Sequence, residues 1–247
     1  MMNEFKILPV IDVLSSQAVH AVKGERSEYK LLKSHLFNTN DPVKILNDLN
    51  KKYHFEVFYV ADLDAIMHGN PNYSIITELC NNSLLKICLD PGIKEFEDIQ
   101  NFAEFKLEKL IIGLETLSSI EVLRESKKYL DSEQILLSID MYDGKVLTRI
   151  ESFKTLTPLE VIKELERNHV DDIILLDLFR VGQKVGGIPP EYLQIRESFK
   201  GNILVGGGIR NIQDVIAYKQ EGFSGILIGT ALYDGSININ ELSRMQK

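Results

Sequence analysis

Two aspartates stand where apolar runs end, Asp12 in PVIDVLS (9–15) and Asp140 in SIDMYDG (138–144). If these runs are parallel strands of one barrel, their carboxyl ends open on a shared mouth. Two carboxylates facing each other across a mouth suit general acid–base chemistry, because one can take a proton while the other gives one. The alternative is that each aspartate only caps the turn after it. Their matching positions favour Asp12 and Asp140 as catalytic residues.

A second set of residues has the character of a phosphate site. VGGGIRN (205–211) and IGTALYD (228–234) put small residues where an apolar run gives way to a helical pattern. Backbone N–H groups at such turns bind anions, and glycine lets the ligand approach closely. Turn formation alone would also use glycine, but two matching loops favour a binding site. The predicted phosphate-binding residues are Gly206, Gly207, Gly208, Gly229, Thr230 and Ala231.

Short apolar runs alternate with amphipathic segments along the whole chain. The runs lack a polar–apolar alternation, as expected of parallel strands that are covered on both faces. Proline follows an N-capping residue at Asp41 and at Thr157, which marks two helix starts. The expected helices include residues 41–52, 118–130 and 157–168, and the expected strands are residues 6–12, 57–63, 84–90, 109–114, 135–140, 172–178, 202–207 and 225–230. Eight strand–helix units of this size predict an α/β fold, a TIM (βα)8 barrel.

The two halves of the sequence resemble each other. DPVKILNDL at 41 pairs with TPLEVIKEL at 157, and IIGLETL at 111 pairs with LIGTALY at 227, both at an offset of 116 residues. A constant offset over distant segments indicates an internal repeat. We therefore expect one domain, 1–247, built from duplicated half-barrels of about 1–125 and 126–247.

Composition narrows the class of protein. The 247 residues carry a net charge of −8 and no basic run, which argues against nucleic acid as a partner. Cys80 and Cys88 are not in a CxxC pattern, so neither a disulfide framework nor a zinc site is expected. No signal peptide and no apolar run of ~18 residues is apparent. We expect a cytoplasmic protein that binds a phosphorylated small molecule and no membrane; its oligomeric state stays open.

The motifs PVID, DPV, VADLDA, SIDMYDGKV, GGGIR and IGTALY together resemble the histidine-biosynthesis barrel family, from residue 6 to about 234. The spacing from Asp12 to KG at 23–24 is closer to the isomerase of that family than to its cyclase. The resemblance implies an Amadori-type conversion of an aminoaldose into an aminoketose, with Asp12 as base and Asp140 as acid. It implies no cofactor and no metal.

Further substrate contacts are expected around the mouth. His20 stands where the isomerase has a basic residue, eight positions after the first aspartate. The resemblance places Asp64, in VADLDA, at the border of the site. Lys23 and Arg26 lie in a polar segment, KGERSEYKLLKS (23–34), that is long enough to cover the mouth as a lid. A solvated loop is the alternative for this segment.

The sequence departs from the isomerase pattern at two places. Leu176 and Val181 stand where the sixth strand of the isomerase is followed by T-x-x-x-x-D-G, and leucine offers no hydrogen bond to a substrate. In the first half, Asp90, Pro91 and Glu115 replace small residues of the expected phosphate turns, and carboxylates oppose an anion. A paralogous aldolase, lyase or isomerase with a monophosphate substrate is therefore an alternative. An inactive phosphate-binding subunit is another, although the retained aspartates argue against it.

Overall fold

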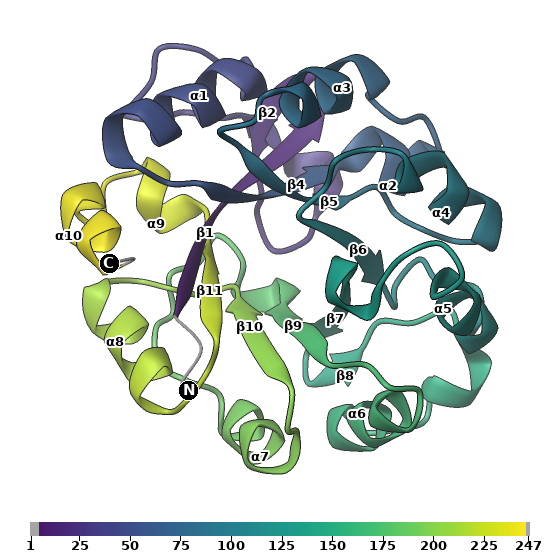
Figure 1. Cartoon of the computed structure of the whole chain (residues 1–247). Coiled ribbons are helices and arrows are strands. Elements are labelled where there is room, and N and C mark those ends of the chain that lie inside the picture. Colours follow the sequence, from purple (N-terminus) through teal and green to yellow (C-terminus); the bar gives the residue numbers. More distant parts are fainter. Residues whose placement is uncertain (1–4, 246–247) are drawn as a thin grey trace.

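Eight parallel strands close into a barrel in the computed structural model, which describes residues 5–245 (Figure 1). Each strand pairs with the next along the chain, and the last pairs with the first, Ile226 beside Ile7. The barrel strands are β1 (Lys6–Leu14), β4 (Val57–Asp62), β5 (Lys86–Asp90), β6 (Lys109–Gly113), β7 (Ile135–Tyr142), β9 (Asp172–Asp177), β10 (Asn202–Gly206) and β11 (Gly225–Ile228). The predicted TIM barrel is confirmed, and the ends of the eight predicted strands differ from the observed ones by at most two residues.

Helices surround the barrel. They are α1 (Pro42–Tyr53), α2 (Leu63–His68), α3 (Tyr73–Asn81), α4 (Phe96–Ala103), α5 (Ile120–Ser126), α6 (Pro158–Arg167), α7 (Pro190–Ser198), α8 (Ile212–Gln220), α9 (Thr230–Tyr233) and α10 (Ile239–Arg244). Both predicted caps are present: Asp41 accepts from Val43 N at 3.0 Å, and Thr157 accepts from Glu160 N at 3.3 Å. Across residues 5–245, none of the helices combines the length and the apolar character that crossing a membrane requires.

Short elements that the sequence patterns did not predict extend the barrel sheet. The strands β2 (Gln17–His20) and β3 (Lys30–Leu31) form an antiparallel extension of β1, and β8 (Lys145–Val146) pairs with the end of β7. Single-turn helices η1 (Arg26–Glu28), η2 (Ser132–Gln134), η3 (Glu151–Phe153) and η4 (Leu178–Arg180) occupy the loops. The polar segment after the first strand is therefore partly sheet, and it holds η1 near the barrel mouth.

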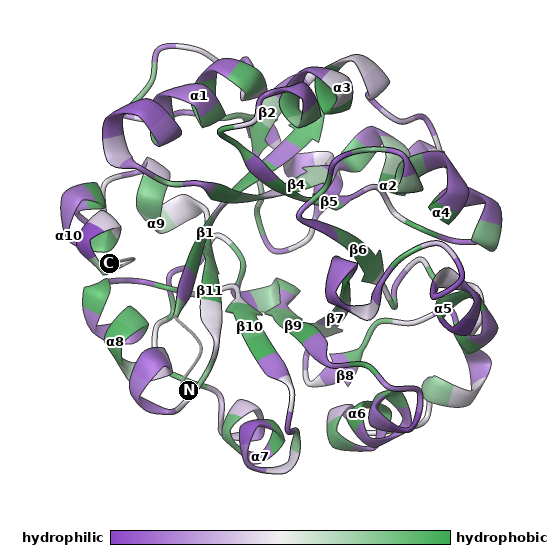
Figure 2. Cartoon of the chain, viewed as in Figure 1, coloured by the Kyte–Doolittle hydropathy of each residue, from purple (hydrophilic) through white to green (hydrophobic). Residues whose placement is uncertain are grey.

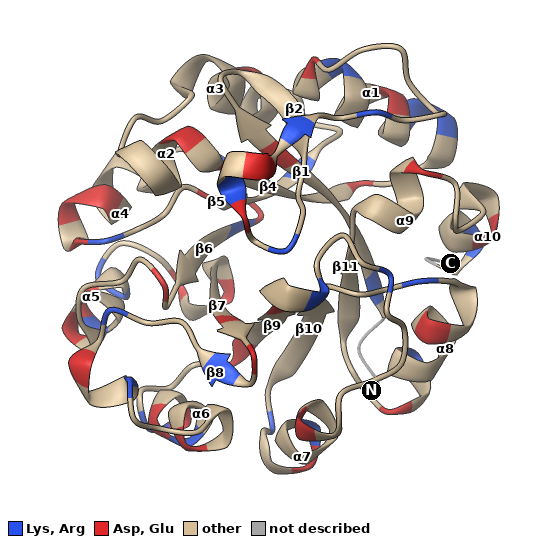
Figure 3. Ribbon diagram, turned by 180° about the vertical axis from the view of Figure 1, so that it is seen from behind, with Lys and Arg blue, Asp and Glu red and all other residues tan. Residues whose placement is uncertain are grey.

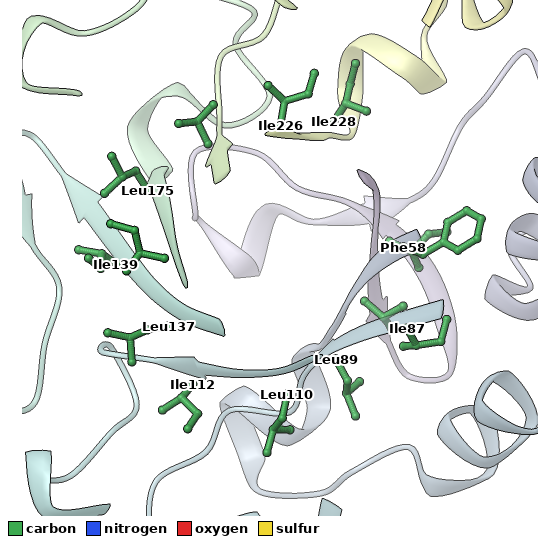
Figure 4. Packing of buried hydrophobic residues seen from close by; sticks show 14 of the residues in the cluster. Phe58, Ile87, Leu89, Leu110, Ile112, Leu137, Ile139, Leu175, Ile226 and Ile228 are labelled. Atoms are coloured by element: carbon green, nitrogen blue, oxygen red, sulfur yellow. The ribbon is translucent and has the colours of Figure 1, made fainter. Parts of the chain in front are cut away.

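Side chains pack in two apolar layers. The larger layer lies between strands and helices, and Figure 4 shows members such as Phe58, Leu137 and Ile226. The smaller layer fills the barrel and includes Leu8 and Ile111. Successive residues of a strand point to opposite faces, so each strand contributes to both layers. Figure 2 shows the result, with hydrophobic strands and with helices that are hydrophobic on part of their surface.

Candidate active site

Side chains alternate between the two faces of a strand, and this alternation directs both predicted catalytic aspartates into the barrel. Leu8 is in the barrel interior, and Asp12, four residues later on β1, lines the cavity at the mouth. Leu136 is likewise interior, and Asp140 follows it on β7 and lines the same cavity. In the ring of strands, β1 and β7 are four places apart. The two carboxylates therefore approach one cavity from opposite sides.

Burial raises the pKa values of the two aspartates that line this cavity. It raises the pKa of Asp12 from 3.8 to about 7, with Arg26 lowering it and the nearby Asp90 raising it. Asp140 is only 6% exposed, and burial together with the charge of Glu115 raises the pKa of its carboxyl further. Ser138 donates to Asp140 Oδ1 at 2.6 Å, which favours the charged form but does not offset burial. Near neutral pH, Asp140 thus keeps a proton and Asp12 titrates.

A third carboxylate, Asp90 at the end of β5, completes the acidic group. Tyr59 donates to Asp90 Oδ2 at 2.9 Å, and the Gly92 N–H donates to Oδ1 at 3.0 Å. These bonds lower the pKa of Asp90, while burial and Glu115 raise it, for a net value of about 6. The backbone N–H of Gly92 is thereby used by a carboxylate of the protein, in the turn where the isomerase pattern has small residues and this sequence is expected to oppose an anion.

Both predicted phosphate loops line the cavity, through residues 206–208 and 229–231. Gly207 and Gly208 have φ of +85° and +80°, which favour glycine. A Cβ on Gly207 would lie 2.6 Å from Asp177 O, so the turn has no room for a side chain at this position. The Thr230 hydroxyl lies 3.5 Å from Nε2 of His20. Burial lowers the pKa of His20.

The four predicted substrate contacts divide into two groups. His20 and Arg26 line the cavity, whereas Lys23 and Asp64 are not among the described residues that do so. Asp64 Oδ2 accepts from Ser15 N at 2.7 Å and from Asn72 Nδ2 at 2.8 Å, which ties β1 to the segment after α2. Its carboxylate serves the scaffold beside the mouth.

Arg26 forms an ion pair with Glu115, just beyond the end of β6, and the two side chains are 28% and 18% exposed. At the sequence offset of 116 residues, Glu115 corresponds to Ala231. Figure 3 shows charged ribbon segments of both signs around the barrel opening. The end of the cavity at β5 and β6 is therefore acidic and partly neutralised by one arginine, and the end at β10 and β11 is formed by glycine turns.

Leu176 and Val181 also line the cavity, as their places in the sequence suggested. Leu176 packs against the apolar layer inside the barrel. Asp177, one residue later, caps η4 by accepting from Phe179 N at 3.1 Å. No hydrogen-bonding group of β9 thus replaces the threonine of the isomerase pattern among the described cavity residues.

Several residues that line the cavity are not among the predicted site residues, for example Tyr29, Tyr59, Lys184 and Tyr233. The period of two in VFYVAD would have placed Tyr59 on the same face as the buried Ala61. Lys184 lies in an irregular loop, where no period marks the direction of a side chain.

The raised aspartate pKa values predict that stability falls as pH rises. An unfolded aspartate ionises near 3.8, and folded Asp12 near 7, so the folded state binds more protons between these values. This stabilisation is complete below about pH 4 and is lost as pH rises through about 7. We expect a melting temperature at pH 8 that is several degrees below that at pH 5, given ~2–4 °C per kcal/mol for a chain of this size.

Thermal unfolding of wild type and Asp140→Asn at the two pH values checks this. Asparagine cannot ionise, so the variant should lose less stability between pH 5 and pH 8. An equal loss in both proteins would contradict the assignment of the pH dependence to the buried carboxyls.

Comparisons with known proteins give a consistent result. A model of the family described as histidine biosynthesis protein matches residues 6–238. An uncharacterised protein of Methanocaldococcus jannaschii is 29% identical over 239 residues, 96% of this chain and 97% of that protein. A Methanococcus maripaludis protein named 1-(5-phosphoribosyl)-5-((5-phosphoribosylamino)methylideneamino) imidazole-4-carboxamide isomerase is 28% identical, over 95% of this chain and 97% of its own. A protein of the same name from Clostridium botulinum is 27% identical, over 95% of each chain.

Proposed function

The chain belongs to the histidine biosynthesis protein family. From this premise we propose that it is an isomerase whose substrate is a phosphorylated, ribosyl-type metabolite, and that it converts the aldose form of this metabolite into the ketose form. Relatives matched over nearly their whole length carry the name of such an isomerase. The observation that carries the proposal is the placement of Asp12 and Asp140 on opposite sides of one cavity that also contains the glycine turns. The reaction uses these side chains and no cofactor.

The two carboxyls divide the proton transfers between them. Asp140, which keeps its proton near neutral pH, gives it to the ring oxygen of an aminoaldose; the C1–O bond breaks and the nitrogen lone pair forms a C=N bond to C1. Asp12, with a pKa of about 7, takes the proton from C2, and the C2–H electrons form the C1=C2 bond of an enolamine while the C=N electrons return to nitrogen. C1 then regains the proton from Asp12 and the C2 hydroxyl gives its proton back to Asp140, so the ketone forms and substrate and product have the same atoms. A catalytic pKa near the working pH favours such transfers.

The second-half loops bind the phosphate in this proposal. Glycine at positions 207 and 208 lets the backbone come close to the anion, and neither loop brings a carboxylate into the cavity. The phosphate then fixes one end of the substrate, so that the sugar lies between Asp12 and Asp140. Orientation of this kind can supply a large part of a rate enhancement.

The residues at the β5 and β6 end of the cavity, opposite the glycine turns, favour a second, related function. The Arg26–Glu115 pair and Asp90 line the end of the cavity where the resemblance implies a second phosphate turn, while the named relatives are isomerases of a compound with two phosphoribosyl groups. The second candidate is therefore an isomerase of another metabolite that carries one phosphate.

Complementation of a bacterial strain that lacks the imidazole-carboxamide isomerase tests the two candidates. Growth without histidine supports the first, provided that the double variant Asp12→Asn, Asp140→Asn fails to restore growth. Absence of growth despite soluble, folded protein favours the second candidate.

Because Leu176 stands in place of a threonine, we expect this protein to turn over the substrate of the imidazole-carboxamide isomerase slowly. Leucine removes a polar contact beside Asp140, with which it is paired across β7 and β9. We expect Leu176→Thr to raise kcat/KM by ~10-fold, because this ratio corresponds to about 1.4 kcal/mol, the free energy that one hydrogen bond typically contributes. Steady-state kinetics checks this, with Leu178→Thr, also at the cavity, as the control. An unchanged or lower kcat/KM in Leu176→Thr would contradict a role for the missing hydroxyl.

A further inference from the structure

The loop between β9 and α7, residues 178–189, lies against the glycine turn of the cavity. Gly186 N donates to Gly208 O at 2.8 Å, and Lys23 N donates to Val181 O at 3.0 Å. Arg180 Nη2 donates to Gly186 O at 2.6 Å. These bonds hold the loop between the segment that follows β2 and the glycine turn after β10.

Lys184 lies in this loop and lines the cavity. Its φ of +49° is in the left-handed region, which is uncommon for residues other than glycine. The ammonium donates to Asp234 Oδ2 at 2.7 Å and to Ser236 Oγ at 2.8 Å. The side chain is 33% exposed, so these partners compete with water and can be exchanged for a ligand.

Lys184 belongs to the glycine end of the cavity. Of the described residues that line the cavity, Arg26 and Lys184 are the lysines and arginines, and Arg26 is paired with Glu115 at the other end. After burial, the charges that shift the pKa of His20 are those of Asp234 and Lys184, and His20 lies 3.5 Å from the Thr230 hydroxyl. Among the described residues that line the cavity, Lys184 is thus the lysine or arginine at its glycine end.

We propose that Lys184 is a phosphate-binding residue whose ammonium exchanges Asp234 for a phosphate oxygen when a phosphate monoester enters the cavity. The inference rests on the proposed function, because it assumes that the phosphate lies in the glycine loops. Asp234 is then a competitor for the lysine, and the strength of the Lys184–Asp234 pair sets the affinity for phosphate. Lysine suits this exchange because its three donors turn freely around a flexible stem.

Calorimetric titration with inorganic phosphate and with ribose 5-phosphate tests the proposal. Lys184→Met should bind both ligands about 10- to 100-fold more weakly, because a hydrogen bond between charged groups is lost. Lys184→Arg should retain most of the affinity. Lys154→Met is the matched control, since Lys154 pairs with Glu151 on an exposed turn and does not line the cavity. Equal affinity of wild type and Lys184→Met would overturn the proposal.

Asp234→Asn separates binding from a structural role. If Lys184 only ties its loop to the end of α9, loss of Asp234 should weaken phosphate binding as Lys184→Met does. If Lys184 binds phosphate, Asp234→Asn releases the ammonium and removes a negative charge, so phosphate affinity should rise by several-fold. Weaker binding in both variants would overturn the proposal, whereas opposite effects support it.

Binding also separates this inference from the proposed isomerase. A protein that shows the two opposite effects on phosphate but no isomerisation keeps Lys184 as a phosphate ligand and refutes the reaction. A protein that isomerises its substrate and binds phosphate equally well with or without Lys184 keeps the reaction and refutes the role of the lysine. Wild type that binds neither inorganic phosphate nor ribose 5-phosphate refutes the phosphate site and with it the role of Lys184.

Discussion

Replacing either strand-end aspartate by asparagine is expected to lower turnover by about 10²–10⁴-fold, the usual contribution of a general acid or base. Asparagine keeps the size of the side chain and removes its exchangeable proton. The barrel should stay folded, because the burial that raises the pKa of Asp12 and Asp140 penalises their charged forms. Initial rates with the isomerase substrate, together with circular dichroism of each variant, measure both effects.

Asp177→Asn is the control for this experiment. Asp177 follows Leu176 on β9, caps η4 and does not line the cavity. Asparagine is as good a cap as aspartate, so turnover should be unchanged. Full activity in Asp12→Asn and Asp140→Asn would refute the acid–base assignment, and equal losses in all three variants would point to a structural effect.

The pH profile distinguishes the base from the acid. As the base, Asp12 must be ionised, so kcat/KM should rise with pH through about 7. As the acid, Asp140 must be protonated, so kcat/KM should fall at higher pH. Residual activity of Asp140→Asn should lose the high-pH fall and keep the low-pH rise. The reverse result would exchange the two roles.

The sequence was most informative where a short-range pattern determines the structure. Strand positions follow from apolar runs, and the inward direction of Asp12 and Asp140 follows from the period of two along β1 and β7. The left-handed turn at Gly207 and Gly208 could likewise be expected, since glycine adopts that conformation at little cost. These features depend on neighbours in the chain.

Contacts between distant segments were harder to predict. Arg26 and Glu115 are 89 residues apart and meet because β2, β3 and η1 bring the first loop to the end of β6. Two strands of two to four residues give too little periodicity to be recognised. Lys184 and Asp234 meet across 50 residues through an irregular loop. Both ion pairs depend on the closed barrel, which places loops remote in sequence around one mouth.

We expect the wild-type cavity to bind one phosphate strongly, at the loops after β10 and β11, and to exclude a second. A unit charge ~4 Å from another contributes about 4 kcal/mol at the effective dielectric of a protein surface. Even if solvent halves this energy, the Glu115 carboxylate should weaken anion binding beside Gly92 and Gly113 by ~10- to 100-fold. Arg26 cannot compensate, because its charge is already paired with Glu115.

Glu115→Ala should therefore open the second position. It gives residue 115 the identity of Ala231, its counterpart 116 residues later, and it releases Arg26 for a phosphate. It also lowers the pKa of Asp90, so that Asp90 remains charged beside this position and limits the gain. A pentose bisphosphate should bind the variant ~10-fold more tightly than it binds wild type, the lower end of the range because Asp90 remains, with little change for ribose 5-phosphate. Calorimetry measures both ligands, with the exposed Glu97→Ala as the control.

Crystals soaked in sulfate give an independent result for the same residues. Wild type should show one anion at the glycine loops, and Glu115→Ala should show a second between Gly92, Gly113 and Arg26. A second anion of comparable occupancy in wild type would mean that Glu115 turns away from the cavity when an anion enters. The single-phosphate candidate would then fail, and a substrate with two phosphoribosyl groups, as in the names of the relatives, would become the expected ligand.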